Sequence, residues 1–131
     1  MKVKNIHHVA IRVKDKQAAC KLYSELFELK FEELGESRET DTRGAIADPG
    51  VEIIEPVTPG GAMAKSIEKY GQGLALLSFE IEDLDTAVAE LKARNIRIIA
   101  NLDRDEFRGV ILHPADVFGV SVELIEYKKH K

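Results

Sequence analysis

The chain is short of the residues that would indicate a disulfide-linked, nucleic-acid-binding or membrane-bound protein. It has one cysteine, Cys20, among 131 residues, so no internal disulfide framework can form. The formal net charge is -4 and the lysines and arginines are scattered, which excludes a basic patch for nucleic acid or an anionic membrane. An apolar signal region is missing after the N-terminal lysines. These absences predict a cytoplasmic protein whose partners are small soluble molecules.

The sequence also lacks a composition change that would mark a flexible linker. A chain of 131 residues is large enough to bury a core without disulfides or a structural metal. We therefore expect a single domain spanning residues 1–131.

The chain contains an internal repeat. Residues from about 4 to 57 and from about 74 to 128 both give an apolar strand, an amphipathic helix and three further strands, with a connector at about 58–73. The closest match is Arg43-Gly-Ala-Ile-Ala-Asp-Pro with Arg108-Gly-Val-Ile-Leu-His-Pro. Two small sheets that each cover one helix are expected to join side by side. The predicted fold class is α+β, with two tandem βαβββ modules forming a shared open cleft.

Alternation along the first strand separates two faces, of which one should line the cleft and the other should face a helix. The cleft face carries Ile6, His8, Ala10 and Arg12. The other face should be covered by a helix with Asp15 as its N-cap and an apolar stripe of Ala19, Leu22, Tyr23, Leu26 and Phe27. In the second copy the strand residues facing the helix are Leu77, Phe79 and Ile81, and the helix stripe is Leu84, Ala87, Val88 and Leu91.

Three residues with metal-binding chemistry fall on the predicted cleft face: His8 on the first strand, and Glu52 and Glu123 on the closing strands of the two copies. A carboxylate that points into a closed cavity is costly unless a partner compensates its charge. A metal ion, a protonated histidine or an open, hydrated cleft could each do so. We favour the metal, because an imidazole and two acids fall in register.

Three segments resemble the vicinal oxygen chelate superfamily, which includes glyoxalases and bleomycin resistance proteins, and within it the methylmalonyl-CoA epimerases. They are His7-His-Val-Ala-Ile-Arg-Val, Met63-Ala-Lys-Ser-Ile-Glu-Lys-Tyr-Gly-Gln-Gly and Leu112-His-Pro-Ala-Asp-Val-Phe-Gly-Val-Ser-Val-Glu-Leu. The resemblance extends over nearly the whole chain. It implies that His8, Glu52 and Glu123 bind a divalent metal such as Co, Mn, Ni, Zn or Mg. At the fourth ligand position the relatives carry a histidine and this chain has Leu76, so metal binding should be weakened or lost.

The same resemblance implies an epimerase-like enzyme that moves a proton alpha to a thioester carbonyl through a metal-chelated enolate. The substrate would be an acyl-CoA, for whose phosphates Lys65 and Lys69 are candidate contacts. Alignment without gaps back from Glu52 gives Glu36 as the base, and a shift of a few residues would select Glu39 or Asp41.

Two other functions are compatible with the sequence. One is a glyoxalase-type lyase, which needs the same metal. The other is a non-catalytic small-ligand-binding protein of the bleomycin-resistance type, which Leu76 favours. In each case the exposed sheet edges predict a homodimer.

Overall fold

The computed structural model describes residues 1–129 and divides into two compact units. We call His8–Ala75 the N-terminal unit, and Met1–His7 together with Leu76–Lys131 the C-terminal unit. The division follows the internal repeat, except that the first seven residues group with the second copy.

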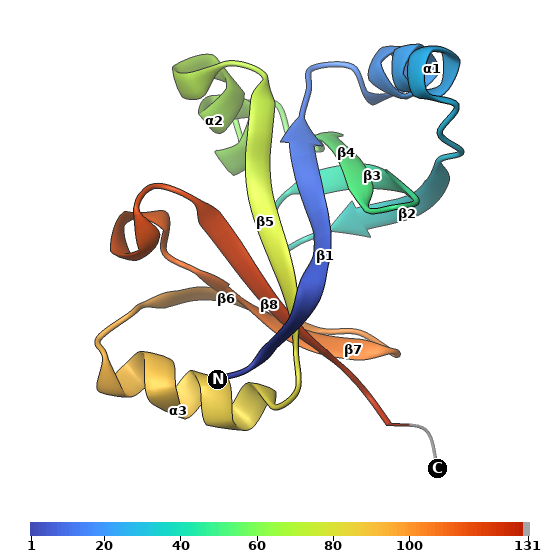
Figure 1. The fold of residues 1–131 in the computed structure, drawn as a ribbon. Coiled ribbons are helices and arrows are strands. Elements are labelled where there is room, and N and C mark those ends of the chain that lie inside the picture. The colour runs from blue at the N-terminus through green and yellow to red at the C-terminus, as the bar shows by residue number, and fades with distance from the viewer. Residues whose placement is uncertain (130–131) are drawn as a thin grey trace. The chain divides into compact units, whose positions relative to one another are not determined.

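Each unit contains one βαβββ module (Figure 1). The first module and the connector comprise β1 (Val3–Arg12), α1 (Lys16–Phe27), β2 (Glu32–Ser37), β3 (Thr42–Ala47), β4 (Val51–Pro56) and α2 (Ala62–Tyr70). The second comprises β5 (Gly73–Ile81), α3 (Leu84–Ala93), β6 (Ile98–Asp103), β7 (Phe107–Leu112), a 3-10 turn (Pro114–Val117) and β8 (Ser121–Tyr127). The predicted α+β class with tandem βαβββ modules is confirmed. Among the described residues, none of the helices has the length and apolar character required to cross a membrane.

The two modules share one strand order. In the N-terminal unit the order is β2-β3-β4-β1, with antiparallel neighbours except for the parallel pair β4 and β1. In the C-terminal unit it is β6-β7-β8-β5, with β8 and β5 as the parallel pair. The opening strand of each copy therefore lies beside its closing strand, which brings the predicted ligand strands together within each module.

The module helices α1 and α3 each begin after an aspartate cap, and a strand glutamate joins each of them to its sheet. The N-cap carboxylates of Asp15 and Asp83 accept from the amides of Ala18 and Thr86, as predicted for Asp15. The first helical amides donate to strand carboxylates: Lys16 N to Glu55 Oε1 at 2.6 Å, and Leu84 N to Glu126 Oε1 at 3.2 Å. Each of these glutamates also lies beside the arginine of the repeated Arg-Gly motif, Arg43 or Arg108.

The C-terminal unit has a well-packed core beneath α3. Ile81, Leu84, Ala87, Leu91, Val110, Leu112 and Leu124 form one buried cluster, and Phe79 and Val88 pack against it. This confirms that Phe79 and Ile81 face α3.

The covering role predicted for α1 is wrong for three residues. Leu22, Leu26 and Phe27 keep 51%, 63% and 60% of their surface exposed, and α1 has no buried residue. The helix instead turns its half-buried Ala19 and Tyr23 inward, toward β3 and β4. Leu22 lies about 100° around the helix from Tyr23 and remains outside the contact.

Candidate active site

His8 and Glu52 lie side by side on one face of the N-terminal sheet. The parallel register pairs Ala10 with Glu52, and His8 precedes Ala10 by two residues, so all three share a face. His8 Nε2 lies 3.5 Å from Glu52 Oε1, and the two side chains are 11% and 18% exposed. The sequence prediction that these residues share a face is confirmed by this contact.

A glycine on the neighbouring strand makes room for the Glu52 carboxylate. Gly44 lies opposite Ile54 on the same face. A Cβ at Gly44 would lie 3.1 Å from Glu52 Oε2 and 3.3 Å from Ile54 Cγ2. The glycine of the Arg-Gly motif therefore permits the close approach of the acid.

The His8 and Glu52 atoms fit a shared cation. Ligand atoms that are each about 2.1 Å from one metal ion lie roughly 3.0 Å apart in octahedral geometry and roughly 3.4 Å apart in tetrahedral geometry. The separation of 3.5 Å between His8 Nε2 and Glu52 Oε1 is close to this range. Within each unit, the described residues contain no group of three or more histidine, cysteine or acidic side chains arranged for a metal.

Glu123 lies in the C-terminal unit, on β8, and is buried at 8% exposure. Register pairs it with Ser78 of β5, whose Oγ donates to Glu123 Oε1 at 2.7 Å. Burial raises the pKa of the Glu123 carboxyl, while the Ser78 hydrogen bond and the charge of Arg104 act in the opposite direction. An ionised Glu123 would therefore gain from an additional cation.

Leu76 stands on the same face of β5 as Ser78, opposite Ser121. It occupies the position in the second copy that His8 occupies in the first. An aliphatic side chain supplies no ligand, so the C-terminal unit offers a carboxylate and a hydroxyl where the N-terminal unit offers a carboxylate and an imidazole.

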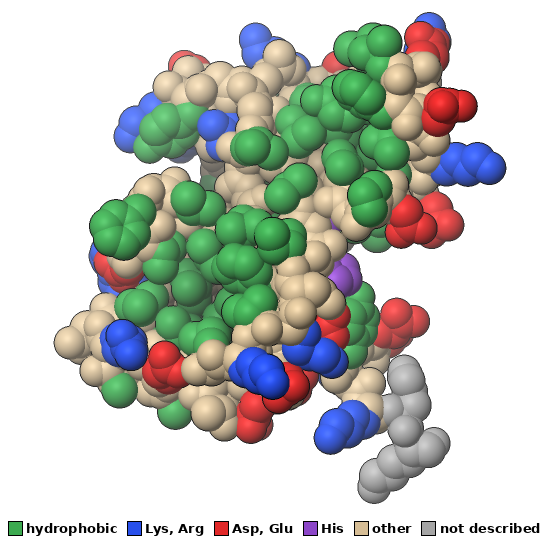
Figure 2. All heavy atoms as spheres, viewed as in Figure 1, with side chains coloured by type: hydrophobic (Ala, Val, Ile, Leu, Met, Phe, Trp, Pro, Cys, Tyr) green, Lys and Arg blue, Asp and Glu red, His purple; other side chains and the backbone are tan. Residues whose placement is uncertain are grey.

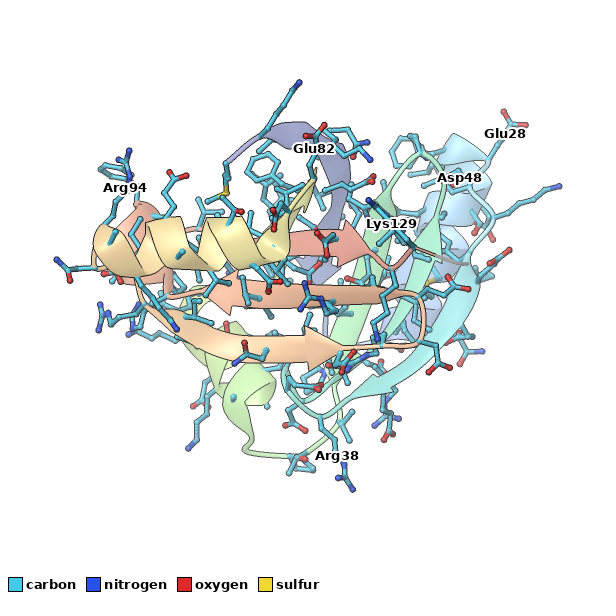
Figure 3. All side chains as sticks on the ribbon, turned by 90° about the horizontal axis from the view of Figure 1, so that it is seen from below. Glu28, Arg38, Asp48, Glu82, Arg94 and Lys129 are labelled. Atoms are coloured by element: carbon cyan, nitrogen blue, oxygen red, sulfur yellow. The ribbon has the colours of Figure 1, made fainter. Side chains whose placement is uncertain are left out.

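The segment that carries Glu36 forms a hairpin of β2 and β3. Glu36 is paired with Arg43, whose register partner on β4 is Glu55. This phase is opposite to that of Glu52, so Glu36 extends from the face that carries α1. The nearby Arg38 extends from the hairpin turn (Figure 3).

The two alternative bases in this hairpin have local partners. Glu39 accepts a hydrogen bond from Ser37 Oγ at 3.1 Å. Asp41 accepts from Thr58 Oγ1 at 2.8 Å, and its carbonyl accepts from Val57 N. The Asp41 contacts join the hairpin to the start of the connector, whereas the Glu39 contact stays within the hairpin.

A model of the glyoxalase/bleomycin resistance protein/dioxygenase superfamily matches residues 5–124. The chain belongs to this superfamily. The match covers both copies of the repeat, including all three predicted ligands.

Relatives of this superfamily member include methylmalonyl-CoA epimerases. The mitochondrial enzyme of Bos taurus is 26% identical over 129 residues, which cover 91% of this chain and 72% of the relative. The uncharacterised protein YqjC of Bacillus subtilis is 27% identical, with 94% and 92% covered.

Solved structures agree in fold with this member of the superfamily. The methylmalonyl-CoA epimerase of Mycobacterium tuberculosis has a TM-score of 0.86 at 25% identity, covering 97% of this chain and 90% of that one. A Streptomyces coelicolor methylmalonyl-CoA epimerase variant in complex with 2-nitronate-propionyl-CoA also has a TM-score of 0.86, at 23% identity, with 98% and 100% covered. At 23% identity, the similarity to the Streptomyces coelicolor structure supports only the fold.

Sequence reasoning missed the role of Ser78 in this superfamily member. Alternation places Ser78 on the face of Leu76, but only the parallel register of β5 and β8 shows that it meets Glu123. One signal was available in the repeat: the position equivalent to Ser78 in the first copy is Ala10, so the polar residue is new to the second copy.

Proposed function

We propose that this protein is a metal-dependent enzyme that removes and returns a proton alpha to the carbonyl of an acyl-CoA thioester, as an epimerase does. The observation that carries the proposal is the His8–Glu52 pair, whose 3.5 Å separation suits a shared cation. Similarity to methylmalonyl-CoA epimerase over 91% of the chain supports the reaction class.

The proposed ligands are the His8 imidazole and the carboxylates of Glu52 and Glu123. One nitrogen and two carboxylates suit Co, Mn, Ni, Zn or Mg, with the harder ions favoured by oxygen. Because Leu76 contributes no ligand, we expect weaker binding than in a relative with four protein ligands. Waters or substrate oxygens would complete the coordination.

When bound, the cation supplies a Lewis acid where negative charge develops on the thioester oxygen. His8 and Glu52 fix its position, since both side chains are largely buried and originate from paired strands. Leu76 presents an apolar surface that strengthens nearby electrostatic interactions. The base stays a prediction: the sequence names Glu36, whereas the register places Glu36 on the α1 face.

The N-terminal unit also contains an open groove beside α2. It has a volume of about 480 Å³ and is lined by Lys14, Pro56, Ala64, Ile67 and Glu68. This volume lies within the range of small-molecule sites. The exposed Lys65 and Lys69, the proposed phosphate contacts, follow the groove residues Ala64 and Glu68 in the sequence of α2.

A second candidate function is non-catalytic binding of a small ligand. Leu76 favours it by removing one ligand, and the Ser78 hydrogen bond gives Glu123 a protein partner without a metal. A protein of this kind would keep the fold and lack proton exchange.

The test is a metal titration followed by an exchange assay. Metal-free protein is titrated with Mn, Co, Ni, Zn and Mg, and the loaded protein is incubated with methylmalonyl-CoA in deuterated water while mass spectrometry follows deuterium at the alpha carbon. We expect stoichiometric binding and exchange, both lost in Glu52→Gln. Glu36→Gln should abolish exchange and spare metal binding if Glu36 is the base.

Two outcomes would overturn the proposal. If none of the metals binds, the metal-dependent enzyme hypothesis is wrong and the small-ligand-binding function is favoured. Binding without exchange on methylmalonyl-CoA or other acyl-CoA thioesters, with turnover of a glutathione hemithioacetal, would favour the glyoxalase-type lyase.

Leu76→His provides a gain-of-function arm. An imidazole here would supply the missing fourth ligand, so we expect Mn or Co affinity to rise by about 10-fold or more. Leu76→Gln is the matched control, because it adds a polar side chain without an imidazole. Equal affinity for Leu76→His and wild type would contradict the assignment of this position as a lost ligand.

A further inference from the structure

Ser78 and Glu123 form a buried pair between the parallel strands of the C-terminal unit. Ser78 is fully buried, at 0% exposure, and Glu123 is 8% exposed. The Ser78 hydroxyl donates a hydrogen bond of 2.7 Å to Glu123 Oε1. Because the two residues are register partners, the backbone of both strands fixes this contact.

The first copy of the repeat shows what the same position does without a hydroxyl. There, the register partner of Glu52 is Ala10, which has no polar side-chain atom. The Glu52 carboxylate lies instead beside the imidazole of His8. In the second copy Leu76 replaces that imidazole and Ser78 replaces the alanine, so the partner of the acid has moved two residues along the strand.

We infer that Ser78 is a positioning residue that fixes the orientation of the Glu123 carboxylate through Oε1 and thereby sets how Glu123 binds a cation. This inference rests on the proposed function, in which Glu123 is a metal ligand. A single rotatable hydroxyl on a fully buried strand residue has little freedom, so it restricts the carboxylate to one orientation. Residues that orient a ligand in this way typically change metal affinity by about 10- to 100-fold when removed.

Ser78 also explains how the second copy tolerates the loss of its imidazole. A buried acid beside Leu76 alone would lack a polar partner on β5, and its ionised form would be costly. The Ser78 hydroxyl supplies a hydrogen-bond donor to the acid from β5. Glu123 therefore keeps a polar partner on β5 although Leu76 replaces the imidazole.

The experiment measures Mn²⁺ binding by calorimetry, and the electron paramagnetic resonance spectrum of bound Mn²⁺, for four proteins. Wild type is compared with Ser78→Ala, which removes the hydroxyl, and with Ser78→Cys, which keeps the volume with a weaker donor. Ser78→Thr keeps the hydroxyl and serves as rescue. Ser121→Ala is the matched control, because Ser121 lies on the same face of β8, opposite Leu76.

We expect Ser78→Ala and Ser78→Cys to weaken Mn²⁺ binding by about 10-fold and to alter the spectrum of the bound ion, while Ser78→Thr and Ser121→Ala resemble wild type. Near-ultraviolet circular dichroism checks that each variant is folded. If Ser78→Ala does not fold, the comparison of Ser78→Cys with wild type decides the test. If Ser78→Cys binds Mn²⁺ with the affinity and the spectrum of wild type, the inference about Ser78 is overturned and the proposed function is not. Absence of Mn²⁺ binding by wild type would overturn the proposed function and the inference with it.

Discussion

At the scale of single residues, the candidate site depends on which side chains are missing as much as on which are present. Gly44 has no Cβ, and the Glu52 carboxylate occupies the adjacent space. The equivalent Gly109 in the second copy serves a different purpose: a Cβ there would lie 2.8 Å from the carbonyl oxygen of Leu124. The repeated Arg-Gly motif therefore contains one glycine that accommodates a functional side chain and one that accommodates the backbone.

Gly44→Ala tests this difference. Its Cβ would displace the Glu52 carboxylate from His8, so we expect Mn²⁺ affinity to fall by about 10-fold with a modest loss of stability. Gly109→Ala is the comparison, because its Cβ clashes with backbone that cannot move easily and should lower the free energy of unfolding by about 1–3 kcal/mol. Calorimetric titration and urea unfolding measure the two effects. A larger loss of Mn²⁺ affinity in Gly109→Ala than in Gly44→Ala would contradict the assignment.

The sequence predicted which strand face carries His8 and Glu52, but it did not predict which residues contact the other candidates. Alternation placed His8 and Glu52 on a common face, and their contact confirms it. The phase of Glu36 could not be found by counting, because β2 has a register shift between Glu33 and Gly35. A bulge of this kind moves every later side chain to the other face, and its position depends on pairing with β3.

At the scale of elements, a charged strand residue fixes each helix to its sheet. Glu126 accepts from the first amide of α3 and from Arg108 Nη2, both at 3.2 Å. Glu55 makes the equivalent contact with the first amide of α1. The carboxylate complements the positive end of the helix, which adds to the effect of the aspartate cap. The capping role of Glu55 and Glu126 depends on tertiary contacts that the spacing of residues in the sequence does not reveal.

Glu126→Gln and Glu126→Ala separate the two interactions. Gln keeps an acceptor for Leu84 N and loses the charged contact with Arg108, whereas Ala loses both. We expect the free energy of unfolding in urea to fall by about 0.5 kcal/mol for Gln and by about 1–2 kcal/mol for Ala. The exposed Glu82→Ala, close to the same helix start, is the control and should change little. An equal loss for Glu82→Ala and Glu126→Ala would show that general charge, and not the cap, is responsible.

Helices α1 and α3 show how much of helix packing can be predicted from hydrophobic periodicity. Both apolar stripes were predicted from the same spacing, yet α3 buries Leu84, Ala87 and Leu91 while α1 buries none. Spacing defines which residues share a helix face, but the rotation of the helix about its axis depends on the sheet beneath it. Strand β3 offers the small Ala45 and Ala47 to α1, whereas β7 offers the larger Val110 and Leu112 to α3.

At the scale of the whole molecule, α1 presents an apolar surface formed by Leu22, Leu26 and Phe27, which we call the α1 surface. Apolar side chains gather over this helix in Figure 2. Beside it, Lys21 and Glu25 form an i,i+4 ion pair, and Figure 3 shows Glu28 directed away from the end of the helix. Along the sequence, the basic Lys21 therefore precedes the α1 surface and the acidic Glu28 follows it. A second α1, crossing antiparallel about a two-fold axis, would place each Lys21 near the acidic end of its partner.

We propose that a second copy of this chain covers the α1 surface, so that the homodimer forms through this helix and not through the sheet edges from which it was expected. Sedimentation equilibrium should show wild type as a dimer at micromolar concentration, and Leu22→Ser with Leu26→Ser should weaken the dimer by at least about 10-fold. Leu74→Ser is the matched control, since Leu74 is 70% exposed and lies outside the α1 surface. Reversing Lys21 or Glu25 alone should weaken association, and exchanging the two charges should restore it, because only a self-complementary contact recovers when both signs are reversed. A monomeric wild type, or a dimer that Leu74→Ser disrupts as strongly, would contradict the proposal.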